Sequence, residues 1–227
     1  MTILHVFTIT SGVLFVALGF CGHAQAGTEQ PDYQVEHSEG DFEVRMYPEQ
    51  IVAETRVQGS MERAGNQAFR PLFRFISGAN RSQTNIAMTA PVGQEKATGE
   101  KIAMTAPVGQ MAASDAGEAS SGVDSSGDAW IVTFMMPSSY TMDTVPEPSD
   151  DAVQLRVIPP HRAASVTYSG RWHQRGYEEH LSLLREWINE NGYQEAGTPI
   201  WARYNSPMTP WFLRRNEVII PIKSDAD

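Results

Sequence analysis

An internal repeat with a spacing of 111 residues constrains the fold of this chain more than any other feature. Aligning the sequence with itself at this spacing gives eight identities within the 36 positions from Arg45 to Asn80. The identical pairs include Arg45 with Arg156 and Asn80 with Asn191, and the hydrophobic pattern runs in parallel. A repeat of this length predicts two copies of one supersecondary unit. We therefore expect a domain built from two similar halves.

Each copy begins with two short segments in which apolar and polar residues alternate. They span 42–47 and 51–57 in the first copy and 153–158 and 163–168 in the second. This alternation predicts β-strands. Because the two segments of a copy follow one another closely, we expect them to pair with each other.

An apolar stripe with helical spacing follows in each copy. In the second copy the stripe consists of Tyr177, Leu181, Leu184 and Ile188, and Asn191-Gly192 ends the predicted helix. In the first copy it consists of Ala68, Leu72 and Ile76, together with Phe69 and Phe73, and Gly78 and Asn80 follow.

Further strands are expected after the helices, at 85–92, 198–204 and 217–222, and between the copies at 130–136. Each half then has the order β-β-α-β-β. The sequence therefore predicts the α+β class, in a single domain over 27–227.

A second, shorter repeat lies between the two copies. The nonapeptide IAMTAPVGQ occurs at 86–94 and again at 102–110, and the following segment, 111–129, is rich in Ser, Gly, Ala and Asp. Such a composition buries too little apolar surface to offset its ordering entropy. We therefore expect a flexible acidic insertion at about 95–129. Residues 95–151 hold ten acidic groups against two lysines, so this region carries −8 of the net charge of −10.

The N-terminal segment has the pattern of a secretory signal peptide. The first 28 residues contain no Asp, Glu, Lys or Arg, an apolar stretch covers 9–20, and a small-x-small motif follows at 24–26. We expect cleavage after residue 26, export to the periplasm or the extracellular space, and no stable membrane insertion afterwards. An uncleaved membrane anchor and lipidation at Cys21 are the alternatives.

Composition and motifs argue against several functional classes. The negative charge disfavours nucleic acid, which is bound mainly through Lys and Arg. No zinc-protease, P-loop, dinucleotide or serine-hydrolase motif is present, and no two histidines of the expected mature chain are four positions apart: His37, His161, His173 and His180. We therefore expect neither a histidine metal site nor an enzyme.

Methionine and arginine are instead distributed as a ligand-binding protein would use them. Several of the ten methionines, among them Met88 and Met104, fall in or near predicted strands, where thioethers suit a broad, flat, apolar ligand. Arginine outnumbers lysine by fourteen to three, and its planar fork suits carboxylates. Core packing and the composition bias of the source genome would give the same pattern.

Three motifs together resemble the SOUL heme-binding protein family, here as a bacterial, exported member. They are the two copies of IAMTAPV at 86–92 and 102–108, YQVEHSEGDFEVRMY at 33–47 and YNSPMTPWFLRRNEVIIPI at 204–222. The resemblance implies a distorted antiparallel β-barrel flanked by two helices and built from two pseudo-symmetric halves. It also places the fold near the small-molecule effector-binding domains of bacterial regulators.

The resemblance implies noncovalent binding of heme or another tetrapyrrole in an apolar cleft, with basic side chains meeting the propionates. Arg45 and Arg56 are our candidates for the propionates, and Met88 and Met104 for the macrocycle. Some eukaryotic members carry a histidine, proposed as an axial iron ligand, where this chain has Met46, so Met46 is the candidate metal ligand. Side chains alternate along a strand, however, so Arg45 and Met46 should face opposite sides. This favours binding without an axial protein ligand.

Two alternatives remain open at this stage. One is a generic binding module for amphipathic small molecules, or an envelope interaction protein, in which heme binding is incidental. The other is an enzyme that acts on tetrapyrroles or small electrophiles. In each case we expect a monomer that binds no nucleic acid.

Overall fold

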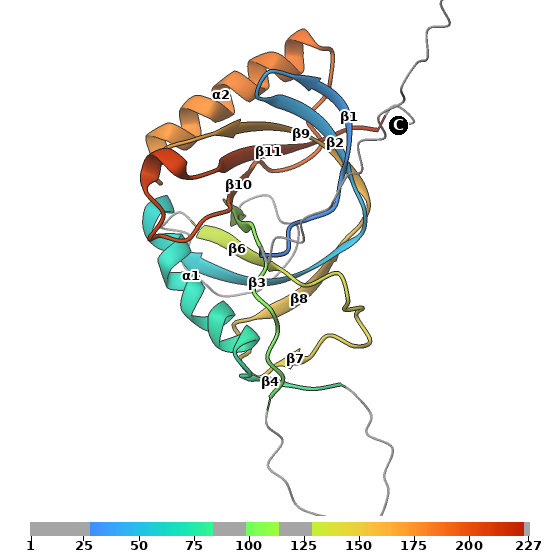
Figure 1. The fold of residues 1–227 in the computed structure, drawn as a ribbon, viewed down its shortest axis with the longest axis vertical. Helices are drawn as coiled ribbons and strands as arrows, with labels where there is room; N and C mark the ends of the chain where they lie inside the picture. Colours follow the sequence, from blue (N-terminus) through green and yellow to red (C-terminus); the bar gives the residue numbers. More distant parts are fainter. Residues whose placement is uncertain (1–27, 84–98, 114–128, 225–227) are drawn as a thin grey trace, which may run out of the picture.

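The structure is a computed structural model that describes residues 28–83, 99–113 and 129–224. Two long helices lie against a curved antiparallel sheet (Figure 1). In chain order the elements are β1 (Gln34–Glu39), β2 (Phe42–Tyr47), β3 (Gln50–Gln58), α1 (Met61–Ile76), β4 (Asn80–Arg81), β5 (Val108–Ala112), β6 (Ala129–Met135), β7 (Glu147–Pro148), β8 (Gln154–Ile158), β9 (His161–Tyr168), α2 (Gln174–Glu190), β10 (Ile200–Arg203), the 3-10 helix Trp211–Leu213 and β11 (Asn216–Ile222).

The main sheet has nine strands in the order β1-β2-β9-β11-β10-β5-β6-β3-β8, and β4 and β7 form a separate pair. Every pairing is antiparallel. Within the described residues, the edge strands β1 and β8 are not hydrogen-bonded to each other, so the sheet is curved but does not close. The α+β class is confirmed, and the expected barrel is present only as this open, curved sheet.

The first strand of each half pairs with the opposite half, so the expected pairing within each half was wrong. Strand β2 pairs with β9, and β3 pairs with β8. The register repeats with the 111-residue spacing, because Tyr47 lies opposite His161 while Ile158 lies opposite Gln50. The turn between the two strands of each half therefore closes no hairpin. The exchange of strand partners ties the two copies into one sheet.

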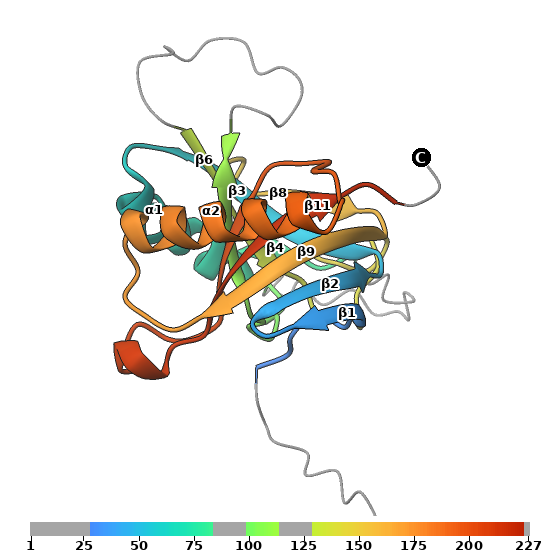
Figure 2. The same cartoon turned by 90° about the horizontal axis from the view of Figure 1, so that it is seen from above.

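Both helices cover one face of the sheet. Helix α1 packs on β3 and β6, and α2 packs on β9 and β11, as Figure 2 shows from above. The predicted stripes are largely buried: Ala68, Leu72 and Ile76 in α1, and Tyr177, Leu184 and Ile188 in α2.

The inclusion of Phe69 and Phe73 in the buried stripe of α1 was wrong, because both rings are exposed. They stack on each other with centroids 5.4 Å apart. Each lies one position beyond a residue that does reach the core, which rotates its side chain by about 100° around the helix axis. Helix α1 therefore presents an aromatic pair to solvent.

The structure places a strand inside the span expected to be an insertion. Strand β5 lies between β10 and β6 near the middle of the sheet, and it follows directly from the second IAMTAPV copy. In that copy Ile102 is buried under α1, and the Thr105 hydroxyl donates a hydrogen bond to the carbonyl of Met135. The first copy, with the strand expected at 85–92, and residues 114–128 of the expected insertion lie outside the described residues.

The predicted signal peptide and its alternative at Cys21 also lie outside the described residues, so they stay predictions. Among the helices that the structure does describe, none is long and apolar enough to cross a membrane.

Candidate functional site

The face of the sheet opposite the helices encloses a cavity of about 880 Å³. Every strand of the main sheet except β1 contributes to its wall. Sites for small molecules and cofactors in proteins occupy about 300–1,000 Å³. The cavity is therefore large enough for a ligand of cofactor size.

Strand alternation explains why the cavity forms. Along β6 the side chains of Ile131, Thr133 and Met135 line the cavity, whereas Val132 and Phe134 pack under α1. Residues on a strand point alternately to opposite faces, so a strand covered by a helix on one side presents its other set of side chains to the cavity.

Most of the wall is apolar. It includes two thioethers, several β-branched side chains and proline rings: Met111, Met135, Ile131, Ile158, Ile200, Ile219, Pro107, Pro159 and Pro221. Such a surface excludes water from a flat apolar ligand, and flexible thioethers adapt to its shape.

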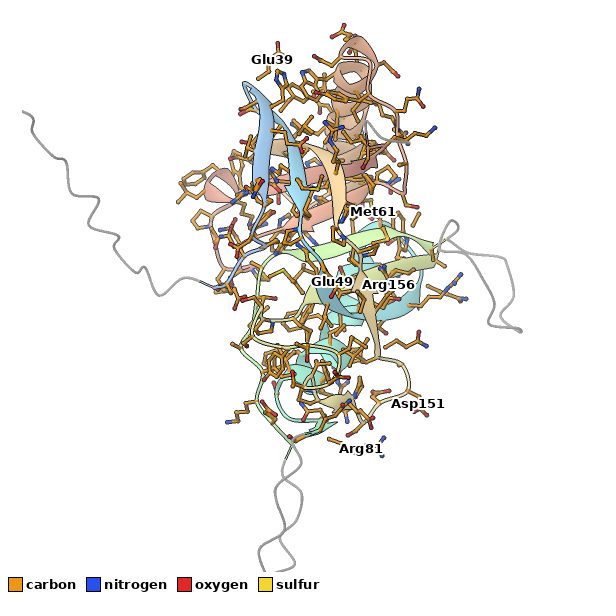
Figure 3. All side chains as sticks on the ribbon, turned by 90° about the vertical axis from the view of Figure 1, so that its right-hand side faces the viewer. Glu39, Glu49, Met61, Arg81, Asp151 and Arg156 are labelled. Carbon is orange, nitrogen blue, oxygen red and sulfur yellow. The ribbon has the colours of Figure 1, made fainter. Side chains whose placement is uncertain are left out.

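Charged groups lie where β3 and β8 border the cavity. Arg156 Nε is 2.9 Å from a carboxylate oxygen of Glu54, and both side chains line the cavity. Arg56, also on β3, is exposed and makes no hydrogen bond or ion pair with the described part of the chain. Figure 3 labels Arg156 together with Asp151, another wall residue. Among the described residues, nothing therefore occupies the guanidinium of Arg56.

A buried ionic cluster lies beside the cavity, centred on Glu217. The Glu217 side chain is fully buried and accepts two hydrogen bonds from Arg45, at 2.9 and 3.1 Å. It also accepts hydrogen bonds from Arg215 at 2.6 Å, the Tyr204 hydroxyl at 2.7 Å and the Thr167 hydroxyl at 3.1 Å. The cluster therefore satisfies a carboxylate that would otherwise be costly to bury.

The pKa values of the cluster follow from this arrangement. Burial alone raises the pKa of Glu217, but the hydrogen bonds and the charge of Arg45 outweigh burial and hold it below the ordinary value. Burial raises the pKa of Tyr47, whose hydroxyl accepts a hydrogen bond from Arg45, to about 12. At neutral pH the cluster therefore contains a carboxylate paired with guanidinium groups, and neutral tyrosines.

The structure brings few of the candidate residues to the cavity. Arg56 lines it, whereas Arg45 is only 2% exposed and is bound to Glu217, Glu43 and Tyr47. Met46 and Met104 are not among the residues that line the cavity, and Met104 is exposed. Met88 lies outside the described residues. The roles assigned to these residues stay predictions.

Sequence reasoning did not single out several residues of the cavity and its border. Arg156, Met111 and Tyr204 line the cavity, and Glu217 lies at the centre of the ionic cluster. A signal for Arg156 was present, because it is the repeat partner of Arg45. The others became recognisable only once strand partners and faces were known.

No group of three or more His, Cys, Asp or Glu side chains suited to a metal ion occurs among the described residues.

A protein-family model described as SOUL heme-binding protein matches residues 28–98 and 92–221, which together cover most of the chain. No curated protein matches the chain.

Solved structures of EcmrR show the same fold at low identity. The C-terminal domain of EcmrR aligns with a TM-score of 0.51 and 14% identity, over 85% of this chain and 98% of that domain. EcmrR in its complex with DNA gives 0.52 and 14%, and this chain covers 58% of the EcmrR chain. A Listeria innocua protein described as a hydrolase gives 0.47 and 11%, over 87% of this chain and 94% of that protein.

Proposed function

The chain belongs to the SOUL heme-binding protein family, and from that premise we propose that it binds heme or a related tetrapyrrole noncovalently in the cavity of the curved sheet. The observation that carries the proposal is a large, mostly apolar cavity bordered by the guanidinium of Arg56, which has no partner among the described residues. A tetrapyrrole with propionate groups has the matching chemistry, since it combines a flat apolar ring with carboxylates.

The residues of the wall fit such a group. Ile131, Ile219, Met111 and Met135 offer apolar contact area in place of water. When bound, the tetrapyrrole supplies its own ring and metal chemistry, and the chain orients it and excludes water.

Arg56 is the residue of this chain that we assign to a propionate. Its guanidinium is exposed at the border of the cavity and forms no ion pair within the described part of the chain, so it gives up no ion pair there when it binds a carboxylate. Arg156 is a second candidate, although it would share its charge with Glu54. Arg45 is already bound to Glu217, and we no longer assign it to a ligand.

Titration with hemin, followed by the Soret band, tests the proposal. We expect saturable binding, with affinity about 3- to 10-fold weaker in Arg56→Met, because a partly exposed charge-assisted contact is lost. Arg175→Met removes an exposed arginine of α2 that does not line the cavity, so this control should bind as the wild type does. Absence of a saturable Soret shift in the wild type would refute the proposal.

The alternative is a generic pocket for amphipathic molecules. Such a pocket should bind an unrelated flat hydrophobe without carboxylates as tightly as it binds hemin, and Arg56→Met should change neither affinity. Specific tetrapyrrole binding predicts a clear preference for hemin and for metal-free protoporphyrin. Turnover of any substrate would replace both proposals with an enzyme.

We propose export as the setting for this function, on the basis of the N-terminal sequence alone. Sequencing the N-terminus of the protein from its source cells tests it, since cleavage would leave a chain that begins at Gly27.

A further inference from the structure

Arg203, the last residue of β10, points away from the proposed heme cavity and toward helix α1. Figure 1 shows α2 on one side of β10 and α1 on the other. On the α1 side a Cβ added at Gly65 would lie 2.5 Å from Nη2 of Arg203, so only glycine lets the guanidinium rest on the helix backbone. On the α2 side Tyr177 packs against Trp201, with ring centroids 5.8 Å apart.

The guanidinium of Arg203 has no carboxylate partner. Nη2 donates to the amide oxygen of Gln110 at 3.0 Å, but no Asp or Glu of the described residues forms an ion pair with it. The Trp201 and Trp172 rings lie 4.9 and 5.6 Å from Cζ and contribute cation–π attraction. Burial lowers the pKa of Arg203 to about 10, which reflects the cost of desolvating the charge.

Three buried polar atoms around the guanidinium make no hydrogen bond of good geometry with the described residues: Arg203 Nε, Trp201 Nε1 and the Tyr168 hydroxyl oxygen. The Trp201 side chain is fully buried, and its ring contacts the guanidinium. The Trp201 indole N–H interacts with the Tyr168 hydroxyl, and this contact and the charge of Arg203 both oppose the upward effect of burial on the pKa of Tyr168.

An unsatisfied buried polar group costs about 1–3 kcal/mol, and native proteins leave few of them. Here each of the three atoms can donate a hydrogen bond, and a positive charge lies among them. The missing component is therefore an acceptor that carries negative charge.

We propose that Arg203, Trp201 and Tyr168, on the helix-covered face of the sheet, bind one small oxyanion, a carboxylate or phosphate group, through their N–H and O–H donors. The planar fork of arginine suits an oxyanion, and the indole and hydroxyl donors add direction to the charge attraction. Ala202 separates this site from the cavity, because its side chain faces the cavity while those of Trp201 and Arg203 face the helices. The chain thus has a second binding site, on the opposite face of the sheet.

Isothermal titration calorimetry of the mature protein tests the site, with sodium phosphate in one arm and sodium acetate in the other, at constant ionic strength. We expect saturable binding of one anion per chain in at least one arm, and the two arms identify the class of oxyanion. Arg203→Met should bind that anion at least about 10-fold more weakly, because the charge-assisted contacts are lost. The control Arg175→Met should bind as the wild type does.

Arg203→Met should keep its fold and its hemin Soret band, because Arg203 does not line the cavity. If it does not fold, Arg203→Lys keeps the charge without the fork and should show weakened anion binding in a folded protein. No saturable binding by the wild type, or undiminished binding by a folded Arg203 variant, would overturn the proposal.

Discussion

Arg45 and Arg156 occupy equivalent positions in the two halves of the sheet. Arg45 lies opposite Ala163 in β9, and Arg156 lies opposite Val52 in β3. Arg156 follows Arg45, and Ala163 follows Val52, by the same 111 residues. Their surroundings have diverged. Arg45 is buried against Glu217, whereas Arg156 is 42% exposed and pairs with Glu54. One position of the repeated unit thus forms part of a buried ion pair in one half and borders the cavity in the other.

This divergence predicts very different costs of substitution. Arg45→Met should destabilise the protein by about 3–5 kcal/mol, because it leaves the buried Glu217 with less compensation. Arg156→Met should cost about 1 kcal/mol or less, as for an exposed ion pair. Urea unfolding measures both values, and equal costs for the two variants would contradict the assignment of Arg45 to the structural cluster.

The acid sensitivity of the protein should depend on Glu217. Its pKa is lower in the fold than its ordinary value of 4.5, so its pairing contributes stability that is present above that pH and is lost as the pH falls through the lower, folded value. Urea unfolding should therefore show the largest stability gap between wild type and Glu217→Gln above about pH 5, narrowing below pH 4.5. The exposed Glu49→Gln should follow the wild type throughout. A gap that does not change with pH would show that Glu217 is not the titrating group.

His173 begins α2 as its N-cap, a role that its sequence context did not indicate. Its Nδ1 accepts a hydrogen bond from the backbone N–H of Gly176 at 2.8 Å. Loss of a side-chain N-cap costs about 0.5–2 kcal/mol. We expect His173→Ala to lower the unfolding free energy by that amount and His173→Asn to retain most of it, since the Asn side chain also accepts at this position. Equal losses in the two variants would speak against a capping role.

The periodic features of the sequence located the elements well, because local chemistry determines them. Alternation placed β2 over the same residues that form it, and the stripe through Leu184 and Ile188 placed α2. The strand partners were not predictable in this way, because β2 and β9 are far apart in the chain and either β3 or β9 could satisfy the backbone of β2.

The environments of the buried charged residues were harder to predict than the strand partners. In the sequence Arg45 and Glu217 resemble the polar residues of a half-exposed strand, and only the curvature of the sheet brings their side chains together. The same limit applies to Arg203, whose environment depends on two helices and the indole of Trp201. Pattern alone therefore found the strands but not the function of their polar residues.

The exposed aromatic pair on α1 supplies a test of where the tetrapyrrole binds. Phe69 and Phe73 form a flat apolar surface with arginines beside them in the helix, at positions 70 and 74. The proposed site is the cavity, on the other face of the sheet. Ala202→Phe adds a ring to the cavity wall and should weaken hemin binding at least about 10-fold, because the ring occupies the space of the ligand. The double variant Phe69→Ser/Phe73→Ser should bind hemin as the wild type does. Soret titration measures the affinities, and near-ultraviolet circular dichroism is the folding control. If the double variant lost hemin binding and Ala202→Phe kept it, the site would lie on the outer face of α1.

The geometry of β2 argues against iron ligation by Met46. Tyr47 lines the cavity from β2, and its neighbour Met46 lies on the other face of the strand, the face of the buried Val44. A thioether on that face cannot reach a metal in the cavity without local unfolding of the strand. We therefore expect Met46→Ala to leave the position of the Soret band and the affinity for hemin unchanged. Metal-free protoporphyrin should then bind with an affinity within about 3-fold of that of hemin, because the apolar wall and Arg56 contact the ring and the propionates rather than the metal. A shifted Soret band in Met46→Ala, together with a large preference for hemin over the metal-free ring, would instead assign the axial ligand to Met46 and require the strand to open on binding.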